Sequence, residues 1–95
     1  MHFPTWVERE RDRRKRAQLR LKYMLSHATL RKYGRTSIHD LARDVGCNHS
    51  SIFNAINRGW FTDVMAQKIE HAVGPKLIQA HWLERPLDIE ATKQA

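Results

Sequence analysis

Three side chains that could bind a metal ion lie close together in the sequence, namely His39, Cys47 and His49. Imidazole and thiolate are ligands that zinc prefers, but a structural zinc site takes four ligands and no good fourth one lies nearby. Cys47 is better explained as a small residue buried in a turn. The sequence therefore predicts no metal site.

No other group of residues indicates catalysis. The chain has no glycine-rich loop that would hold a phosphate, and no serine or cysteine sits within a nucleophile signature. Isolated histidines such as His27, His71 and His81 are ordinary in folded proteins. We therefore expect a protein that is not an enzyme, uses no cofactor and has no evident small-molecule substrate.

The charges indicate a polyanionic partner. The net charge of the 95 residues is +7. Residues 1–33 contain ten Lys or Arg and three acids (10 − 3 = +7), whereas residues 34–95 contain seven of each and are neutral. Lys and Arg that neutralise phosphates release counterions, so binding should weaken steeply with salt. The excess is concentrated in one basic strip: Arg9, Arg11, Arg13, Arg14, Lys15, Arg16, Arg20 and Lys22.

The strip belongs to an expected long first helix. Thr5 and Glu8 match a capping box after Pro4, and the helical pattern can run from there to Tyr33, where Gly34 stops it. Residues 7–16 show no apolar face. Apolar spacing begins at Ala17 and continues through Leu21, Met24, Leu25 and Ala28. We accordingly expect a basic, helical extension over residues 1–16, a folded domain over residues 17–86 and a flexible tail over residues 87–95.

Four shorter helices should follow. Ser37, Asn48 and Thr62 are suitable N-caps, and Gly46, Gly59 and Gly74 are suitable stops. The expected ranges are 38–45, 49–57, 63–73 and 75–83, the last limited by Pro86. Phe53, Trp60, Phe61 and Trp82 are expected in the core, and Trp6 outside it. The fold class is all-α with about five helices.

The stretch from Ile38 to Asn57, IHDLARDVGCNHSSIFNAIN, has two short helices joined at Gly46, Cys47 and Asn48. Ala42 allows close helix approach, and Gly46 gives the turn its backbone freedom. This stretch resembles the helix-turn-helix of the lambda repressor and Cro family of phage regulators. The resemblance implies a lambda-repressor-like fold and sequence-specific binding of duplex DNA, with the helix at 49–57 in the major groove.

The resemblance also implies roles for individual residues. The start of the 49–57 helix would face the bases, where Asn54 could contact adenine and His49 guanine. Asn48 is equally suited to being only an N-cap. The expected base-reading residues are Asn48, His49, Ser50, Ser51 and Asn54. The expected phosphate-binding residues are Asn57, Arg58, Arg31, Lys32, Arg35, Arg13, Arg14, Lys15 and Arg16.

A regulator of this type would act as a homodimer on a two-fold operator, and repression is favoured over activation. No apolar run reaches eighteen residues, and the start lacks the apolar stretch of a signal peptide, so we expect a cytoplasmic, nucleoid-associated protein without membrane contact. Two other functions stay open. One is RNA binding through the arginine-rich helix. The other is a protein-interaction module such as an antitoxin or anti-repressor.

Overall fold

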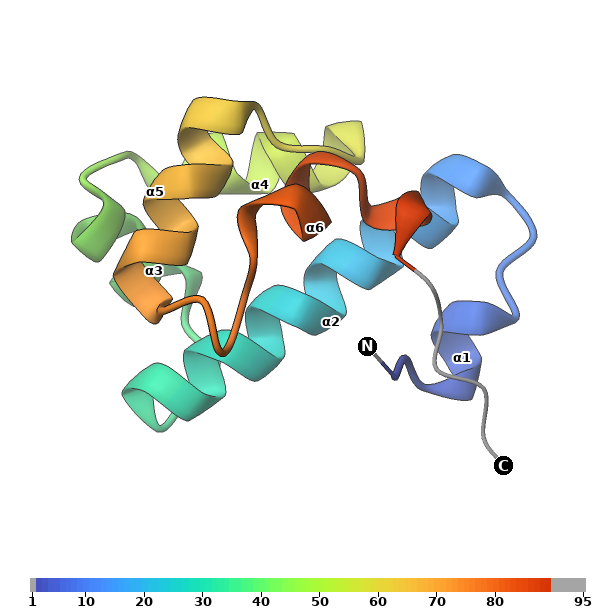
Figure 1. The fold of residues 1–95 in the computed structure, drawn as a ribbon, viewed down its shortest axis with the longest axis horizontal. Coiled ribbons are helices and arrows are strands. Elements are labelled where there is room, and N and C mark those ends of the chain that lie inside the picture. The colour runs from blue at the N-terminus through green and yellow to red at the C-terminus, as the bar shows by residue number, and fades with distance from the viewer. Residues whose placement is uncertain (1, 90–95) are drawn as a thin grey trace.

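The computed structural model describes residues 2–89 and shows an all-α protein, as expected (Figure 1). No strand occurs within the described range. A long helix, α2, runs diagonally through the molecule, and the shorter helices pack around it. The elements are α1 (Thr5–Glu8), α2 (Arg13–Tyr33), α3 (Ile38–Val45), α4 (His49–Arg58), α5 (Asp63–Val73), α6 (Ala80–Glu84) and the 3-10 helix η1 (Pro86–Asp88).

Local capping sets the ends of the middle helices. The side chains of Ser37, Asn48 and Thr62 accept hydrogen bonds from the backbone N–H groups of Asp40, Ser50 and Met65, so each expected N-cap is confirmed. Helices α2, α3 and α4 each end at a glycine in the left-handed conformation. The expected ranges of α3 and α5 are confirmed, and α4 extends one residue beyond the expected range, to Arg58.

The continuous helix expected from Thr5 to Tyr33 is wrong, because the chain breaks over residues 9–12. Thr5 does not cap α1, whose N-cap is Pro4 without a side-chain hydrogen bond. Asp12 starts a separate helix by accepting from the N–H of Lys15 at 2.8 Å. The break lets the segment before it fold back onto α2.

This folding back buries residues that the sequence analysis placed in a surface extension. Val7 is fully buried and Phe3 nearly so, and both belong to the same hydrophobic cluster as Leu21, Met24 and Leu83. The expectation that residues 7–16 have no apolar face and lie at the surface is therefore wrong for Val7. The break at residues 9–12 explains why helical spacing did not reveal it.

Arg20 joins the two ends of the described chain to the middle of α2. Its side chain is buried and forms an ion pair with Glu8 of α1 at 3.1 Å. Its guanidinium also donates to the carbonyl oxygens of Pro86 and Ile89 at 2.8 and 2.9 Å, and it lies 4.6 Å from the ring centre of Phe3. Although it belongs to the basic strip of the sequence, Arg20 is a structural residue.

The last helix begins later than expected, at Ala80 and not at Pro75. Residues 75–77 form a turn, and Gln79 is extended, which brings both Ile78 and Leu83 into the core. No local side chain caps α6. Instead, the Glu70 carboxylate of α5 accepts from the N–H of Ala80 at 2.7 Å. Of the expected tail, residues 90–95 lie outside the described residues.

Candidate functional site

The pair formed by α3, α4 and the turn between them is held rigidly against α2. Leu41 and Ala42 of α3 and Ile52 and Ala55 of α4 are all buried, as the apolar spacing predicts. In the turn, the backbone N–H groups of Gly46 and Cys47 both donate to the Ala42 carbonyl, at 2.9 and 3.0 Å. The buried sides of the two helices therefore fix which side of α4 faces outward.

The outward side of α4 is mostly polar, with Phe53 as its exposed apolar residue. All five expected base-reading residues are exposed on it or at its start: Asn48, His49, Ser50, Ser51 and Asn54. Ser50, Asn54 and Asn57 follow one another at spacings of four and three residues, so they form one row along the helix. This arrangement leaves a helix with one side in the core and a continuous row of hydrogen-bonding groups on the other.

Asn48 and Ser50 are bonded to each other. The Asn48 Oδ1 atom accepts from the Ser50 N–H at 3.1 Å and from the Ser50 hydroxyl at 2.9 Å. The Asn48 oxygen is thus engaged in capping α4, and only its amide NH₂ is directed to other partners. His49, Ser51 and Asn54 are accordingly the more accessible members of the expected set.

His49 lies in a group of rings that joins the two helices. The ring centres of His39, on α3, and His49 are 4.2 Å apart, and the Phe53 ring meets His49 edge-on at 6.1 Å. Phe53 is 44% exposed, so its expected packing in the core is wrong. It lies one turn after His49, at the border between the polar row and the protein body. The sequence already grouped His39 with His49, and the packing of α3 against α4 brings their two rings into contact.

The end of α4 contacts the beginning of α2. The Asn57 carbonyl accepts from Arg14 at 3.3 Å and from the Gln18 amide at 2.6 Å. The Arg58 guanidinium lies 4.1 Å above the Trp60 ring and donates twice to the Trp60 carbonyl. Trp60 is 47% exposed, so its expected burial is wrong, whereas Phe61 is buried as expected.

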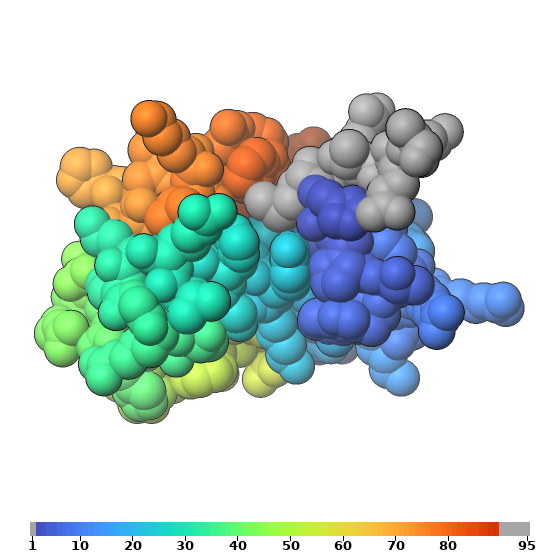
Figure 2. All heavy atoms as spheres, turned by 90° about the horizontal axis from the view of Figure 1, so that it is seen from below, coloured from blue at the N-terminus to red at the C-terminus, as the bar shows by residue number. Residues whose placement is uncertain are grey.

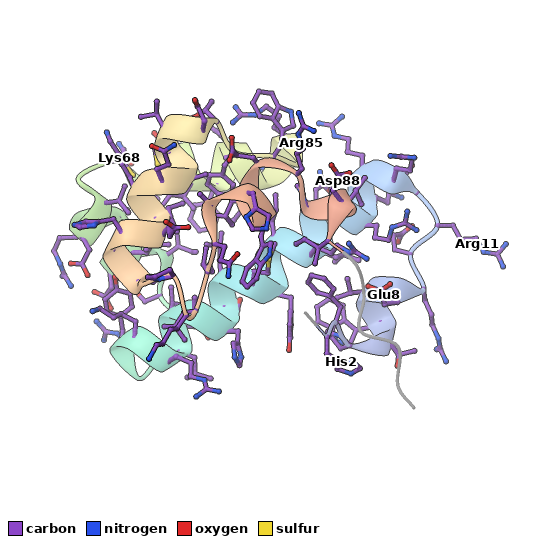
Figure 3. All side chains as sticks on the ribbon, viewed as in Figure 1. His2, Glu8, Arg11, Lys68, Arg85 and Asp88 are labelled. Carbon is purple, nitrogen blue, oxygen red and sulfur yellow. The ribbon has the colours of Figure 1, made fainter. Side chains whose placement is uncertain are left out.

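This contact brings the basic start of α2 beside α4. Arg13, Arg14 and Lys15 are exposed, while Arg16 is half-buried and donates to the Glu10 carbonyl at 3.4 Å. In Figure 2, the spheres of α3 and α4 (green to yellow-green) and of the start of α2 (blue) follow one another along the same lower edge. Figure 3 shows Arg11, in the loop before α2, pointing away from the protein body.

A second group of cations lies at the other end of α2. Arg31 and Lys32 are exposed in its last turn, about 27 Å or more from Arg13 along the helix axis. Arg35 and Arg43 both bind the Asp40 carboxylate, at 2.7 and 2.9 Å, while their own side chains stay largely exposed. The sequence analysis did not include Arg43, although its i,i+3 spacing from Asp40 would have indicated the pairing. The expected phosphate-binding residues thus form two separate groups, one near each end of α2.

The side chains of Asp40 and Tyr33 have shifted pKa values, and the contacts that shift them hold α3 in place. The hydrogen bond from Arg35 to Asp40 is the main reason that the pKa of this carboxyl lies below its ordinary value of 3.8. Burial, followed by the hydrogen bond to Asp44 at 2.6 Å, raises the pKa of Tyr33 far above its ordinary value. These contacts fasten the loop before α3, and α3 itself, to the end of α2.

Cys47 is half-buried in the turn, and burial raises the pKa of its thiol. A raised pKa disfavours the thiolate that metal binding and nucleophilic attack require. Among residues 2–89, no group of three or more His, Cys, Asp or Glu side chains is arranged to hold a metal ion. The partial burial and the raised pKa agree with Cys47 being a turn residue.

Comparison with protein-family models, curated proteins and solved structures finds no match to this chain. Within the described residues, no helix is both long and apolar enough to cross a membrane.

Proposed function

We propose that the chain binds duplex DNA in a sequence-specific manner, with α3 and α4 acting as a helix-turn-helix of the lambda repressor and Cro type. The observation that supports this most directly is the polar row on α4, exposed along the helix while the opposite side is buried. The major groove, about 12 Å wide, admits a single helix that presents such a row. The proposal also takes the exposed cations near the two ends of α2 as contacts for DNA phosphates.

The proposal assigns different tasks to the residues around α4. Asn54 offers both a donor and an acceptor, which suits the edge of adenine, and a ring nitrogen of His49 can donate to guanine. Ser50 and Ser51 lie beside them, and Asn48 mainly caps the helix. Arg58 and Asn57 at one end of α4, and Arg35, Arg31 and Lys32 near α3, would bind phosphates and set the register. Arg43 joins this second group.

We further propose that the protein works as a regulator without catalytic activity, most simply as a repressor that blocks polymerase. A two-fold operator would require two copies of the chain. The measurement that addresses symmetry is the spacing of half-sites in the bound DNA, where a dimer predicts two related half-sites about 10 base pairs apart or a multiple of that.

The test begins with selection of bound fragments from random duplex DNA, followed by affinity measurements on the selected sequence. His49→Ala and Asn54→Ala should each reduce discrimination between the selected and a random sequence by about 1–3 kcal/mol, or roughly 5- to 150-fold. Weak non-specific binding should persist in both variants, because the phosphate contacts remain.

Matched controls come from α5, where His71 and Gln67 are exposed. His71→Ala and Gln67→Ala should leave sequence discrimination unchanged. If no sequence is enriched in the selection, or if the preference survives both α4 substitutions, the proposed reading of bases by α4 is wrong. The affinity for a structured RNA should be measured at the same salt concentration and compared with the affinity for duplex DNA. Stronger binding to the RNA would favour the basic strip as the principal binding element.

A further inference from the structure

We propose that His39 and His49 together form a binding site for a divalent transition-metal ion such as Ni²⁺ or Zn²⁺, with one imidazole nitrogen contributed by each helix. The two rings meet across the junction of α3 and α4, although ten residues separate them in the sequence. The site is independent of the DNA-binding proposal, because it rests only on the placement of these two side chains.

The geometry of the two rings suits a shared ion. Metal–nitrogen bonds of 2.0–2.1 Å place two ligand nitrogens on the same ion about 3 Å apart. Ring centres 4.2 Å apart can bring one nitrogen of each ring to that separation by rotation of the side chains. The ring planes are tilted by 43° to each other, so the two imidazoles are not stacked in parallel.

The surroundings leave both imidazoles available. Both side chains are exposed, and neither imidazole forms a hydrogen bond or ion pair with any of residues 2–89. The Phe53 ring, one turn later on α4, also contacts His49 edge-on at 6.1 Å. Helices α3 and α4 are packed against the same core, so the ion would not have to organise the backbone. Water would complete the coordination, since these two side chains supply only two ligands.

The two imidazole ligands determine which class of metal ion the proposed site would prefer. Neutral imidazole suits zinc, nickel and copper, whereas Mg²⁺ and Ca²⁺ prefer oxygen ligands. The nearest negative charge on the same helix, Asp40, is already shared by Arg35 and Arg43, so the site offers nothing to hard cations. Mg²⁺ should therefore not compete with Ni²⁺.

The direct test is titration of the full chain with Ni²⁺, followed by calorimetry and by broadening of backbone amide signals in NMR spectra. We expect one ion per chain, with the first broadened signals around residues 39 and 49. Loss of a group that only supports a ligand costs about 10- to 100-fold in metal affinity, so His39→Ala and His49→Ala should each weaken binding at least tenfold.

Two further histidines serve as controls. His71→Ala, on α5, and His2→Ala, next to the amino terminus, should leave this binding unchanged. Absence of saturable binding, broadening centred on another part of the chain, or equal affinity of the wild type and the His39→Ala/His49→Ala double variant would overturn the proposed site.

One consequence rests on the proposed function. A metal ion that occupies His49 would compete with a DNA base for the same nitrogen, so Ni²⁺ should weaken specific DNA binding by the wild type and leave that of His39→Ala unaffected. If the protein binds no DNA at all, the proposed function fails, while the Ni²⁺ titration still decides the metal site.

Discussion

The α3–α4 pair and the basic N-terminal third differ in how well helical spacing predicts which side chains are buried. In α3 and α4, buried apolar and exposed polar positions mostly follow helical spacing, with the buried Asp40 and the exposed Phe53 as exceptions. In the N-terminal third, residues of the same chemical type have opposite roles: Arg13 is exposed, whereas Arg20 is 5% exposed and holds α1 and η1 onto α2. Net charge therefore does not show which cations of a region are exposed and which are structural.

The largest effect expected from this difference concerns stability. Arg20→Ala should lower the free energy of unfolding by about 3 kcal/mol or more, because it leaves Glu8 without its partner and two carbonyl groups without donors. Arg13→Ala should change it by less than about 0.5 kcal/mol. Urea unfolding followed by circular dichroism measures both. Arg20→Lys, which keeps the charge but loses the fork of donors, should fall between them. Equal unfolding midpoints for the two alanine variants would contradict the structural role of Arg20.

The second effect concerns the exposed cations of α2. Replacing Arg13 and Lys15 by Gln should lower the slope of log affinity for DNA against log salt by up to about 2, since each lost phosphate contact removes about 0.9. The free energy of unfolding should stay close to that of the wild type. Lys76→Gln, after the end of α5, is the control and should not change the slope. An unchanged slope in the double variant would remove the start of α2 from the interface.

The third effect separates capping from base reading at Asn48. Asn48→Ala should destabilise the fold by about 1 kcal/mol, because the N–H of Ser50 loses its acceptor. Asn48→Asp keeps an acceptor at the cap and should preserve stability. Thermal unfolding distinguishes the two variants. Should Asn48→Ala leave stability unaltered but reduce sequence discrimination, the residue would be a base reader and not primarily a cap.

The smallest effect is confined to acid pH. Because the folded-state pKa of Asp40 lies below its ordinary value, the charged carboxylate stabilises the fold at neutral pH, and this stabilisation is lost as the pH falls below about 4. The stability advantage of the wild type over Asp40→Asn should therefore shrink in acid. Arg35→Gln removes the main cause and should raise the pKa of Asp40, measured by NMR titration. A constant advantage down to pH 2 would show that the ion pairs contribute no charge-dependent stability.

Local signals in the sequence were sufficient for the fold class and for most of the middle helices. Ser37, Asn48 and Thr62 act within three residues of themselves, and Gly46 needs only its own backbone to end a helix, so short-range patterns predicted these positions. The same holds for the buried side of α4, where Ile52 and Ala55 define the orientation. The exposure of the expected base-reading residues follows from that orientation.

What could not be predicted depends on contacts between distant residues. The break at residues 9–12 is favoured because Phe3 and Val7 gain burial against α2, and helical spacing within the segment contains no sign of that. The later start of α6 depends on Glu70, ten residues away, and on the simultaneous burial of Ile78 and Leu83. The exposure of Trp60 and Phe53 likewise depends on how α4 packs in the folded protein, which composition does not reveal.

The Arg20 contacts also carry a consequence for how the chain closes on itself. One guanidinium reaches back 12 residues to Glu8 and forward 66 and 69 residues to Pro86 and Ile89, so the first and last described segments meet at a common point. Contacts of such long sequence separation form at the expense of much loop entropy and tend to appear together. Shortening the protein from either terminus should therefore loosen the opposite terminus as well, which hydrogen exchange at Val7 and Leu83 would detect.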